Sequence, residues 1–215
     1  MRKEIRILTC LLLLLSLFAG CGKQKPAPNN IVAYINGEAI TAREIDYFKT
    51  RDRADIINAF SEQYGVTDFS DFWDRDFDGT TPTQALEEKA FEDACDAKIR
   101  LVLMREKGVY EDISFEGLEA KTLAYNDAHK NQKNTVGVQS IDMQQFYTYY
   151  ISTGEMTLKN ILGEGELKPT DAQIRACIAQ KGEMTEQGAI SYLVDAKYAE
   201  YVQSLLEQAT VTMEE

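Results

Sequence analysis

The chain has few of the residue types on which most catalytic and metal sites depend. Among its 215 residues are one histidine, four cysteines, four prolines and one tryptophan. The histidine, His129, has no cysteine and no second histidine at ligand spacing, so the sequence does not indicate a zinc site or a histidine-based catalyst. It also lacks a Gly-x-Ser-x-Gly nucleophile motif and a complete glycine-rich phosphate loop. We therefore predict no catalytic residue and no cofactor.

Positive charge is scarce as well. The chain has 23 Lys and Arg against 35 Asp and Glu, which gives a formal net charge of −12. A surface of this sign repels the phosphates of nucleic acids and anionic lipid head groups, so we expect no nucleic-acid partner. Hydrophobic residues make up 44% of the chain, which is enough for a buried core.

The N-terminus has the segment order of an export signal. Basic residues come first, an apolar run over 7–19 follows, and an Ala-Gly pair stands directly before Cys21. This ending resembles a bacterial lipobox, although Phe stands where Leu is usual. The run is too short for a transmembrane helix, which needs about 20 residues. We expect a signal peptide over 1–20, lipid on Cys21, a polar tether over 21–30 and a folded domain over 31–215. A plain secretory signal and a short membrane anchor are the alternatives.

The remaining cysteines do not form a disulfide framework. Cys10 would leave with the signal and Cys21 would carry lipid, so that only Cys95 and Cys177 are left. Two distant cysteines can form one disulfide outside the cell. We favour the other interpretation, in which both are buried thiols that act as small core residues.

The pattern along the rest of the chain predicts a mostly helical fold with a small β-sheet. A strand over 31–35, an Asn-Gly turn and a second strand over 38–40 form a hairpin. Capping-box sequences begin at Thr41, Thr81 and Thr170, and Ser140 is the expected cap of another helix. We predict helices over 41–65, 81–107, 115–130, 141–163, 170–181 and 185–208. A last strand over 209–213 is expected to pair with the first.

This layout resembles the N-terminal chaperone domain of the SurA/PrsA family of extracytoplasmic foldases. The resemblance covers residues 31–213 and is carried by the segments Val32–Ile45, Leu86–Leu103 and Leu167–Ile174, with the last helix and strand. It implies a SurA N-like helical domain that is closed by pairing of the N-terminal hairpin with the C-terminal strand. It also implies a protein on the extracytoplasmic face of the cell membrane that binds unfolded or exported polypeptides in a hydrophobic groove between helices.

The chain departs from many relatives at one place. A parvulin-type prolyl isomerase domain often lies between the short helix and the last helix, whereas here only residues 181–184 fill that gap. The missing insert argues against isomerase catalysis. A degenerate prolyl isomerase and a dedicated interaction subunit of an envelope complex remain alternatives.

Two aromatic groups are the candidate client-binding residues, because aromatic rings with a polar tip suit varied apolar partners. The first group lies in an acidic loop and the second on the helix over 141–163. The candidates are Phe69, Phe72, Trp73, Phe77, Phe146, Tyr147, Tyr149 and Tyr150. Neighbouring residues of a helix point in different directions, so some of the second group should be exposed. The alternative for each ring is a place in the core.

The acidic loop also matches half of a calcium-binding loop. Asp74, Asp76 and Asp78 alternate before Gly79, as in an EF-hand, but Ala85 stands where a bidentate Glu is required. The competing interpretation is an acidic turn ahead of a helix N-terminus, where negative charge is favourable.

Overall fold

The computed structural model describes residues 30–130 and 140–214. The predicted signal peptide, the lipid site at Cys21 and nearly all of the tether lie outside the described residues, as does the predicted loop over 131–139. The described residues are mostly helical with one small three-stranded sheet, which confirms the predicted fold class at that level. None of their helices is long and apolar enough to span a membrane.

The chain divides into two compact units. Unit 1 comprises the described residues up to Cys95 together with those from Thr210 onward, and unit 2 runs from Asp96 to Ala209. Helix α3, Pro82–Glu106, contributes its first part to unit 1 and its second part to unit 2.

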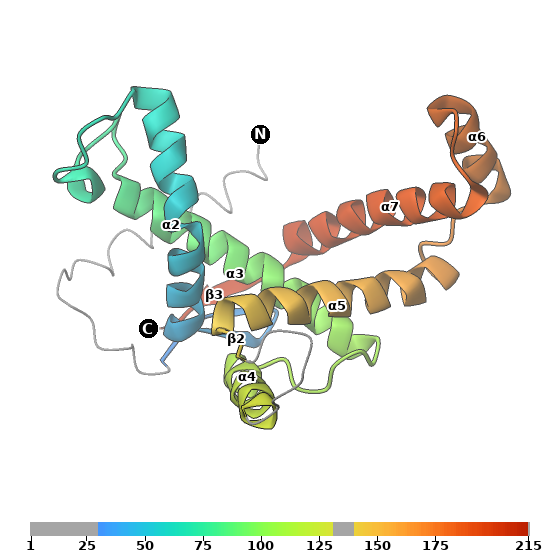
Figure 1. Cartoon of the computed structure of the whole chain (residues 1–215), viewed down its shortest axis with the longest axis horizontal. Coiled ribbons are helices and arrows are strands. Elements are labelled where there is room, and N and C mark those ends of the chain that lie inside the picture. The colour runs from blue at the N-terminus through green and yellow to red at the C-terminus, as the bar shows by residue number, and fades with distance from the viewer. Residues whose placement is uncertain (1–29, 131–139, 215) are drawn as a thin grey trace. The chain divides into compact units, whose positions relative to one another are not determined.

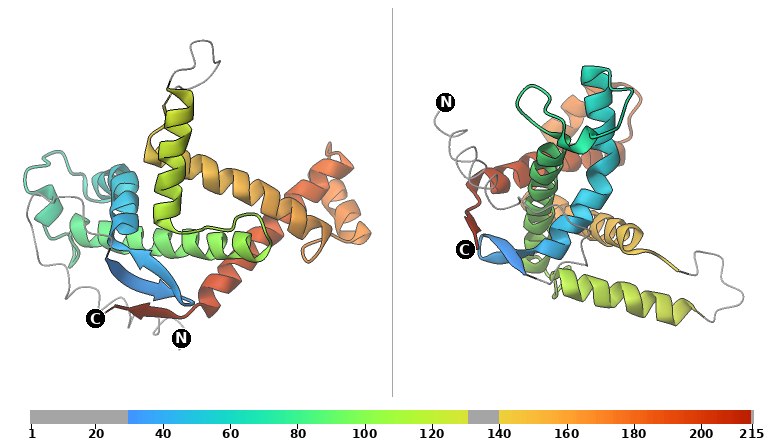
Figure 2. Two further views of the ribbon diagram at one scale, coloured as in Figure 1. Left: turned by 90° about the horizontal axis from the view of Figure 1, so that it is seen from below. Right: turned by 90° about the vertical axis from the view of Figure 1, so that its left-hand side faces the viewer.

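The sheet of unit 1 brings the two ends of the folded chain together. Strands β1 (Ile31–Ile35), β2 (Glu38–Thr41) and β3 (Val211–Met213) form an antiparallel sheet in the order β2-β1-β3. Figure 2 shows the three strands side by side. The strand pairing predicted between the two ends of the chain is therefore present.

Strand β3 pairs with β1 in a defined register. Ile35 lies opposite Val211 and Ala33 opposite Met213. Beyond the strand, the backbone N–H of Glu214 donates to the carbonyl of Val32 at 3.1 Å. Ala33 and Ile35 are buried, so this strand contributes directly to the core of unit 1.

The hairpin between β1 and β2 turns at Asn36-Gly37, where both residues have positive φ (50° and 84°). Asn and Gly are the residues that tolerate this conformation, which two-residue hairpins need. The Asn36 side chain also accepts a hydrogen bond from the N–H of Thr210 at 2.9 Å. The hairpin turn is thereby tied to the start of the C-terminal strand.

Helix α2 (Ala42–Tyr64) begins where the sequence predicts. The Thr41 side chain accepts from the N–H of Glu44, and the helix ends at Gly65 in a left-handed conformation. The buried side of α2 includes Ile45, Phe48 and Ile56, whose spacing places them on one face of the helix.

Helix α3 begins with the predicted capping box. The Thr81 hydroxyl accepts from the N–H of Gln84 at 3.2 Å, and the Gln84 side chain accepts from the N–H of Thr81 at 2.9 Å. Pro82 occupies the first helical position, where its missing N–H costs nothing. Between α2 and α3 the short helix η1, Phe72–Asp74, interrupts an irregular loop.

Unit 2 is built from the second part of α3 and four further helices. These are α4 (Phe115–His129), α5 (Met143–Glu164), α6 (Asp171–Lys181) and α7 (Glu186–Gln208). Figure 1 shows α6 folding back along the start of α7.

One predicted helix start in unit 2 is wrong. Asp142, and not Ser140, caps α5: its carboxylate accepts from the N–H of Gln145 at 2.7 Å, and the Gln145 side chain accepts from the N–H of Asp142. The reciprocal pair satisfies two backbone donors, which a cap at Ser140 would leave without this partner. The capping box predicted at Thr170 is confirmed.

Cys95 and Cys177 are both buried and are not joined by a disulfide, as the favoured interpretation predicts. Cys95 lies in unit 1 and Cys177 in unit 2. The Cys177 thiol packs with Ile174 and Ala189 in the small core between α6 and α7.

Candidate functional site

The candidate client-binding residues fall into two groups in different units. Phe69 to Phe77 belong to unit 1, and Phe146 to Tyr150 belong to unit 2. Each group is therefore a separate surface, with its own supporting contacts.

The first group forms the α2–α3 tip, which we define as residues 60–81 and which Figure 1 shows at the end of the α2–α3 hairpin. Phe72 is the centre of a small aromatic core there. Its ring lies 5.4 Å from that of Phe69, 5.2 Å from that of Trp73 and 6.0 Å from those of Phe60 and Phe77. Phe72 is only 1% exposed, so it stabilises the loop and is not available to a client.

The other rings of the tip are more accessible. Phe69 is 49% exposed, whereas Trp73 and Phe77 are half-buried. Two guanidinium groups of the chain lie over these rings: Arg53 is 4.0 Å from the centre of the Trp73 ring, and Arg75 is 5.7 Å from that of Phe77. Stacking of this kind holds the rings in place while leaving Phe69 in solvent.

The acidic residues of the tip do not gather as a metal site. No group of three His, Cys, Asp or Glu that could hold a metal occurs in the part of the chain that the structure describes, and this includes Asp74, Asp76 and Asp78. The Asp76 carboxylate instead accepts from the N–H of Gly79 at 3.1 Å. The geometry thus supports the competing interpretation, an acidic turn ahead of α3.

A tight hairpin turn accounts for the presence of Asp78 and Gly79 in this loop. Phe77 and Thr80 exchange backbone hydrogen bonds of 2.9 and 3.2 Å, and the two residues between them, Asp78 and Gly79, have φ of 56° and 93°. A two-residue hairpin turn requires positive φ at both central positions, and Asp-Gly is a favoured pair.

Most of the second group is core. Phe146, Tyr147 and Tyr150 are buried, and only Tyr149 is exposed, at 58%. The three buried rings face α4 and the loop before it, through contacts with Phe115, Tyr125 and Tyr110. Three of the four predicted client contacts on α5 are therefore unavailable, because α4 and this loop cover that side of the helix.

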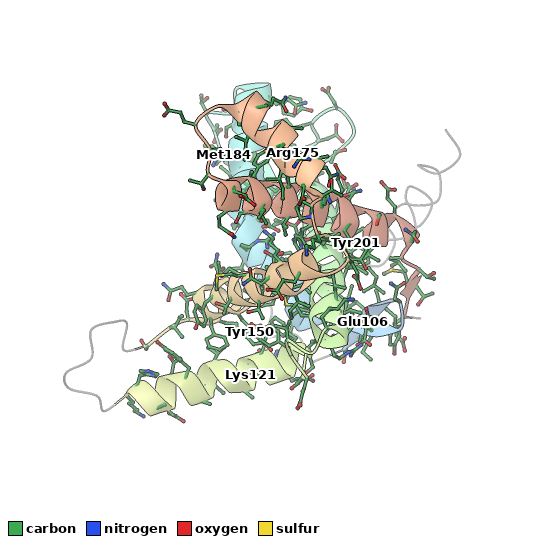
Figure 3. All side chains as sticks on the ribbon, turned by 90° about the vertical axis from the view of Figure 1, so that its right-hand side faces the viewer. Glu106, Lys121, Tyr150, Arg175, Met184 and Tyr201 are labelled. Atoms are coloured by element: carbon green, nitrogen blue, oxygen red, sulfur yellow. The ribbon has the colours of Figure 1, made fainter. Side chains whose placement is uncertain are left out.

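Tyr150 is held by contacts from two directions. Its ring stacks on that of Tyr110, with centres 3.9 Å apart, and the Tyr110 hydroxyl donates to the Tyr150 carbonyl at 2.8 Å. From α4, Lys121 donates to the Tyr150 hydroxyl at 2.9 Å, and Figure 3 shows these two residues facing one another. Burial, with a smaller effect of Tyr150, raises the pKa of Tyr110 to about 12. The Tyr110 phenol therefore stays a donor at neutral pH.

A second polar network joins three helices of unit 2. Arg100 of α3 donates to Asp96 on the same helix at 2.6 Å and also to Glu155 of α5. Tyr198 of α7 donates to Glu155 at 3.1 Å.

The pKa shifts in this network have opposing causes. Burial lowers the pKa of Arg100, but hydrogen bonds to Asp96 and Glu155 outweigh it and raise the pKa. Burial and the Glu155 charge raise the pKa of Tyr198. Both side chains keep their protons, and each has a partner, so the network is a structural link between helices.

The accessible apolar side chains lie mainly in unit 2. Among the described residues, six large hydrophobic side chains are exposed, and five of them belong to unit 2. This apolar set of unit 2 consists of Leu123 (66% exposed), Met156 (62%), Tyr149 (58%), Tyr192 (45%) and Ile161 (41%). Tyr149 and Met156 are seven residues apart on α5 and therefore share one face of that helix.

Sequence reasoning named only Tyr149 of this set as a binding candidate. Leu123 and Met156 lie off the buried stripes of their helices, whereas Ile161 lies on the buried side of α5 near its end. The position of an apolar residue off the buried stripe is the sequence signal that could have identified such exposed side chains, because the buried stripe is the side of a helix that packs against its neighbours.

Comparisons of the chain with protein-family models, with curated proteins and with solved structures found no match. The function is therefore argued from the residues described above.

Proposed function

We propose that the protein is a membrane-anchored, extracytoplasmic chaperone-like lipoprotein that holds unfolded or exported polypeptides. The observation that carries this proposal is the apolar set of unit 2. Five large apolar side chains on three helices, α4, α5 and α7, face solvent. Exposed apolar surface on an otherwise folded unit is typical of polypeptide binding.

The chemistry of the set suits a partner that lacks a fixed shape. Burial of apolar surface gains about 25 cal/mol per Å², whatever its sequence. Met156 has a flexible thioether side chain that adapts to irregular surfaces. Tyr149 and Tyr192 offer an apolar ring with a polar tip, so they tolerate mixed segments.

The net charge supports the same function. At −12 the chain repels its own copies, which keeps a protein with exposed apolar side chains soluble. A bound client with exposed apolar segments would gain the same protection.

The finer fold assignment is part of this proposal. Pairing of β3 with β1, and the helices between them, supports a SurA N-like domain, as the resemblance implies. The N-terminal sequence supports export and lipid attachment at Cys21. Incorporation of radiolabelled palmitate that is lost in Cys21→Ser would test the anchor, and an unchanged label in that variant would contradict it.

The function is tested by aggregation of a denatured reporter protein, followed by light scattering. The full chain is held in nanodiscs of neutral lipid, with empty nanodiscs as the blank. We expect suppression at several-fold excess over the reporter, and we expect Met156→Lys to weaken it. Asn160→Lys is the matched control, because it adds the same charge at an exposed position of the same helix.

The two variants separate the possible outcomes. Loss of suppression in Met156→Lys with retention in Asn160→Lys supports binding at the apolar set. Equal loss in both variants would show that net charge and not apolar surface governs the effect. No suppression by the unmodified chain would overturn the proposal.

A further inference from the structure

The α2–α3 tip exposes an aromatic side chain that its surroundings hold in place. Phe69 is the single large hydrophobic residue of unit 1 that is exposed, among the residues described. Its ring rests edge-on against Phe72, with centres 5.4 Å apart, and Phe72 is buried by its other aromatic neighbours. An ordered ring that is half in solvent loses little entropy on binding, which suits it as an anchor of an interface.

The loop that carries Phe69 has its own supports. Arg75 donates to the carbonyls of Ser70 at 2.8 Å and Asp68 at 3.3 Å. The N–H of Ser70 donates to the Asp68 carboxylate at 2.9 Å. These bonds fix the backbone on both sides of Phe69.

The segment that carries the exposed ring is strongly acidic. Residues 66–80 contain five Asp and a single basic residue, Arg75. All five carboxylates are exposed, and in the described parts of the chain none of them forms a salt bridge. The guanidinium of Arg75 is directed to backbone carbonyls instead. The tip therefore has negative charge that a cationic partner would neutralise.

Arginine side chains of unit 1 stack on two aromatic rings of the tip. Arg53 lies 4.0 Å from the centre of the Trp73 ring, and Arg75 lies over Phe77. A planar guanidinium stacks on aromatic faces and also pairs with carboxylates. Phe69 has carboxylates on both sides in sequence, at Asp68 and Asp71, but within residues 30–130 and 140–214 no guanidinium lies over its ring.

We propose that the α2–α3 tip docks an arginine-bearing apolar segment of a partner polypeptide, with Phe69 as the aromatic anchor and Asp68, Asp71 and Asp74 as the anionic rim. The apolar part of the segment covers the Phe69 ring, and its guanidinium groups meet the carboxylates. Anionic lipid does not fit this surface, because its charge has the same sign. This inference does not rest on the proposed function, which is carried by residues of unit 2.

The probe is a short fluorescein-labelled peptide in which Arg and Leu alternate, with a peptide of Glu and Leu for comparison. The full chain in neutral nanodiscs is titrated into each peptide, and binding is read by fluorescence anisotropy at physiological salt. We expect saturable binding of the Arg peptide only. Because Trp73 is the only tryptophan, its emission should change with the same midpoint.

Three variants locate the binding. Phe69→Ser should weaken it about fivefold or more, because an exposed ring is lost without disturbing the core. The pair Asp71→Asn and Asp74→Asn keeps side-chain shape, and Asn tolerates the positive φ of Asp71, so it also should weaken binding about fivefold. The pair Glu183→Gln and Glu200→Gln makes an equivalent charge change at exposed positions of unit 2 and should leave affinity within about twofold.

Circular dichroism shows whether each variant is folded. The Asn pair keeps the proposal testable if Phe69→Ser disturbs the loop. Equal weakening by the unit 2 charge pair would show unspecific attraction to an acidic protein and would overturn the proposal. It would also be overturned by full binding in both Phe69→Ser and the Asn pair, by unchanged Trp73 emission at saturation, or by absence of binding.

Discussion

The two units of this molecule treat large apolar side chains in opposite ways. Unit 1 encloses them: its sheet and helices bury Ile35, Phe48 and Phe72, and among its described residues only Phe69 is exposed. Unit 2 leaves five exposed, and its helices are joined in part through polar contacts such as Arg100 with Glu155. The number of apolar residues alone thus does not reveal a binding surface, because only the exposed apolar side chains can contact a partner.

The difference has a basis in how each unit is closed. Unit 1 uses the last residues of the chain to complete a sheet, so both of its ends are fixed. Unit 2 is a set of long helices, and each helix has more surface than its neighbours cover. Side chains off the contact stripe, such as Met156 and Leu123, then remain in solvent.

The largest expected effect comes from opening unit 1 at β3. Deletion of residues 210–215 removes strand β3 and its pairing with β1, and with it three hydrogen bonds outside the ladder: from Asn36 to Thr210, from Thr210 to Asn36 and from Glu214 to Val32. At about 1 kcal/mol each, these three bonds alone account for about 3 kcal/mol, and the lost ladder adds to this decrease in the free energy of unfolding of unit 1. Urea unfolding followed by Trp73 emission measures this, since Trp73 lies in unit 1.

A shorter deletion is the control. Removal of Glu214 and Glu215 takes away only the bond to Val32 among these three, so about 1 kcal/mol should be lost. If the longer deletion leaves the urea midpoint of the Trp73 transition unchanged, β3 does not stabilise unit 1. That result would contradict the explanation given above for the difference between the two units.

The second effect probes the polar link within unit 2. Arg100→Met removes the cation that joins Asp96 and Glu155 and leaves two carboxylates that are partly buried. We expect a loss of about 2 kcal/mol, below the cost of breaking a fully buried pair because water reaches this one. Far-UV circular dichroism in urea reports the unfolding of these helices.

Lys159→Met is the matched control for Arg100→Met. Lys159 also lies over the Tyr198 ring, at 5.0 Å compared with 5.7 Å for Arg100, and it pairs with Asp195. Asp195 is mostly exposed, so the loss should stay below about 1 kcal/mol. Equal losses in the two variants would show that contact with Tyr198, and not the carboxylate link, is what stabilises unit 2.

Helix starts and the β1–β2 hairpin could be predicted because their signals are local. Thr81 with Gln84, and Thr170 with Gln173, specify a helix start within four residues. The wrong helix start predicted at Ser140 can also be explained from local sequence. Asp142 has Gln145 three positions later, and that partner distinguishes it from Ser140.

Burial on α5 could not be predicted in the same way. Phe146 and Tyr150 are covered by residues of α4 and by Tyr110, which are distant in sequence. Gly154 shows the same limit. The sequence suggests only a weakened helix there, but a Cβ at this position would lie 2.6 Å from the Tyr110 ring, so a side chain has no room. Contacts between elements decide which aromatic residues are free to bind.

The third prediction tests the corrected start of α5. Asp142→Ala removes the carboxylate that accepts the N–H of Gln145 and should cost about 1 kcal/mol, the usual effect of losing an N-cap. Ser140→Ala should leave the free energy of unfolding nearly unchanged. Urea unfolding of both variants by circular dichroism measures the difference, and a larger cost for Ser140→Ala would restore the sequence-based start.

The smallest effect compares one motif that occurs in both units. Asp68-Phe69-Ser70 lies in unit 1 and Asp112-Ile113-Ser114 in unit 2, and in each the Asp carboxylate accepts from the Ser N–H at 2.9 Å. Asp112 also accepts from the Ser114 hydroxyl, at 2.7 Å. Hydrogen bonds from Ser70 and Ser114 lower the pKa of Asp68 and Asp112, respectively.

A lowered pKa in the folded state stabilises the fold above the ordinary Asp value of about 3.9, and this stabilisation is lost as pH falls through the folded pKa. Ser114→Ala removes the hydroxyl donor, so the pKa of Asp112 should rise and, with the backbone donor retained, remain below its ordinary value. The pKa of Asp68 should not change. Carboxyl chemical shifts in an NMR pH titration measure both groups in one sample. A rise at Asp68 would mean that the two motifs are coupled, whereas no rise at Asp112 would assign its low pKa to the backbone donor alone.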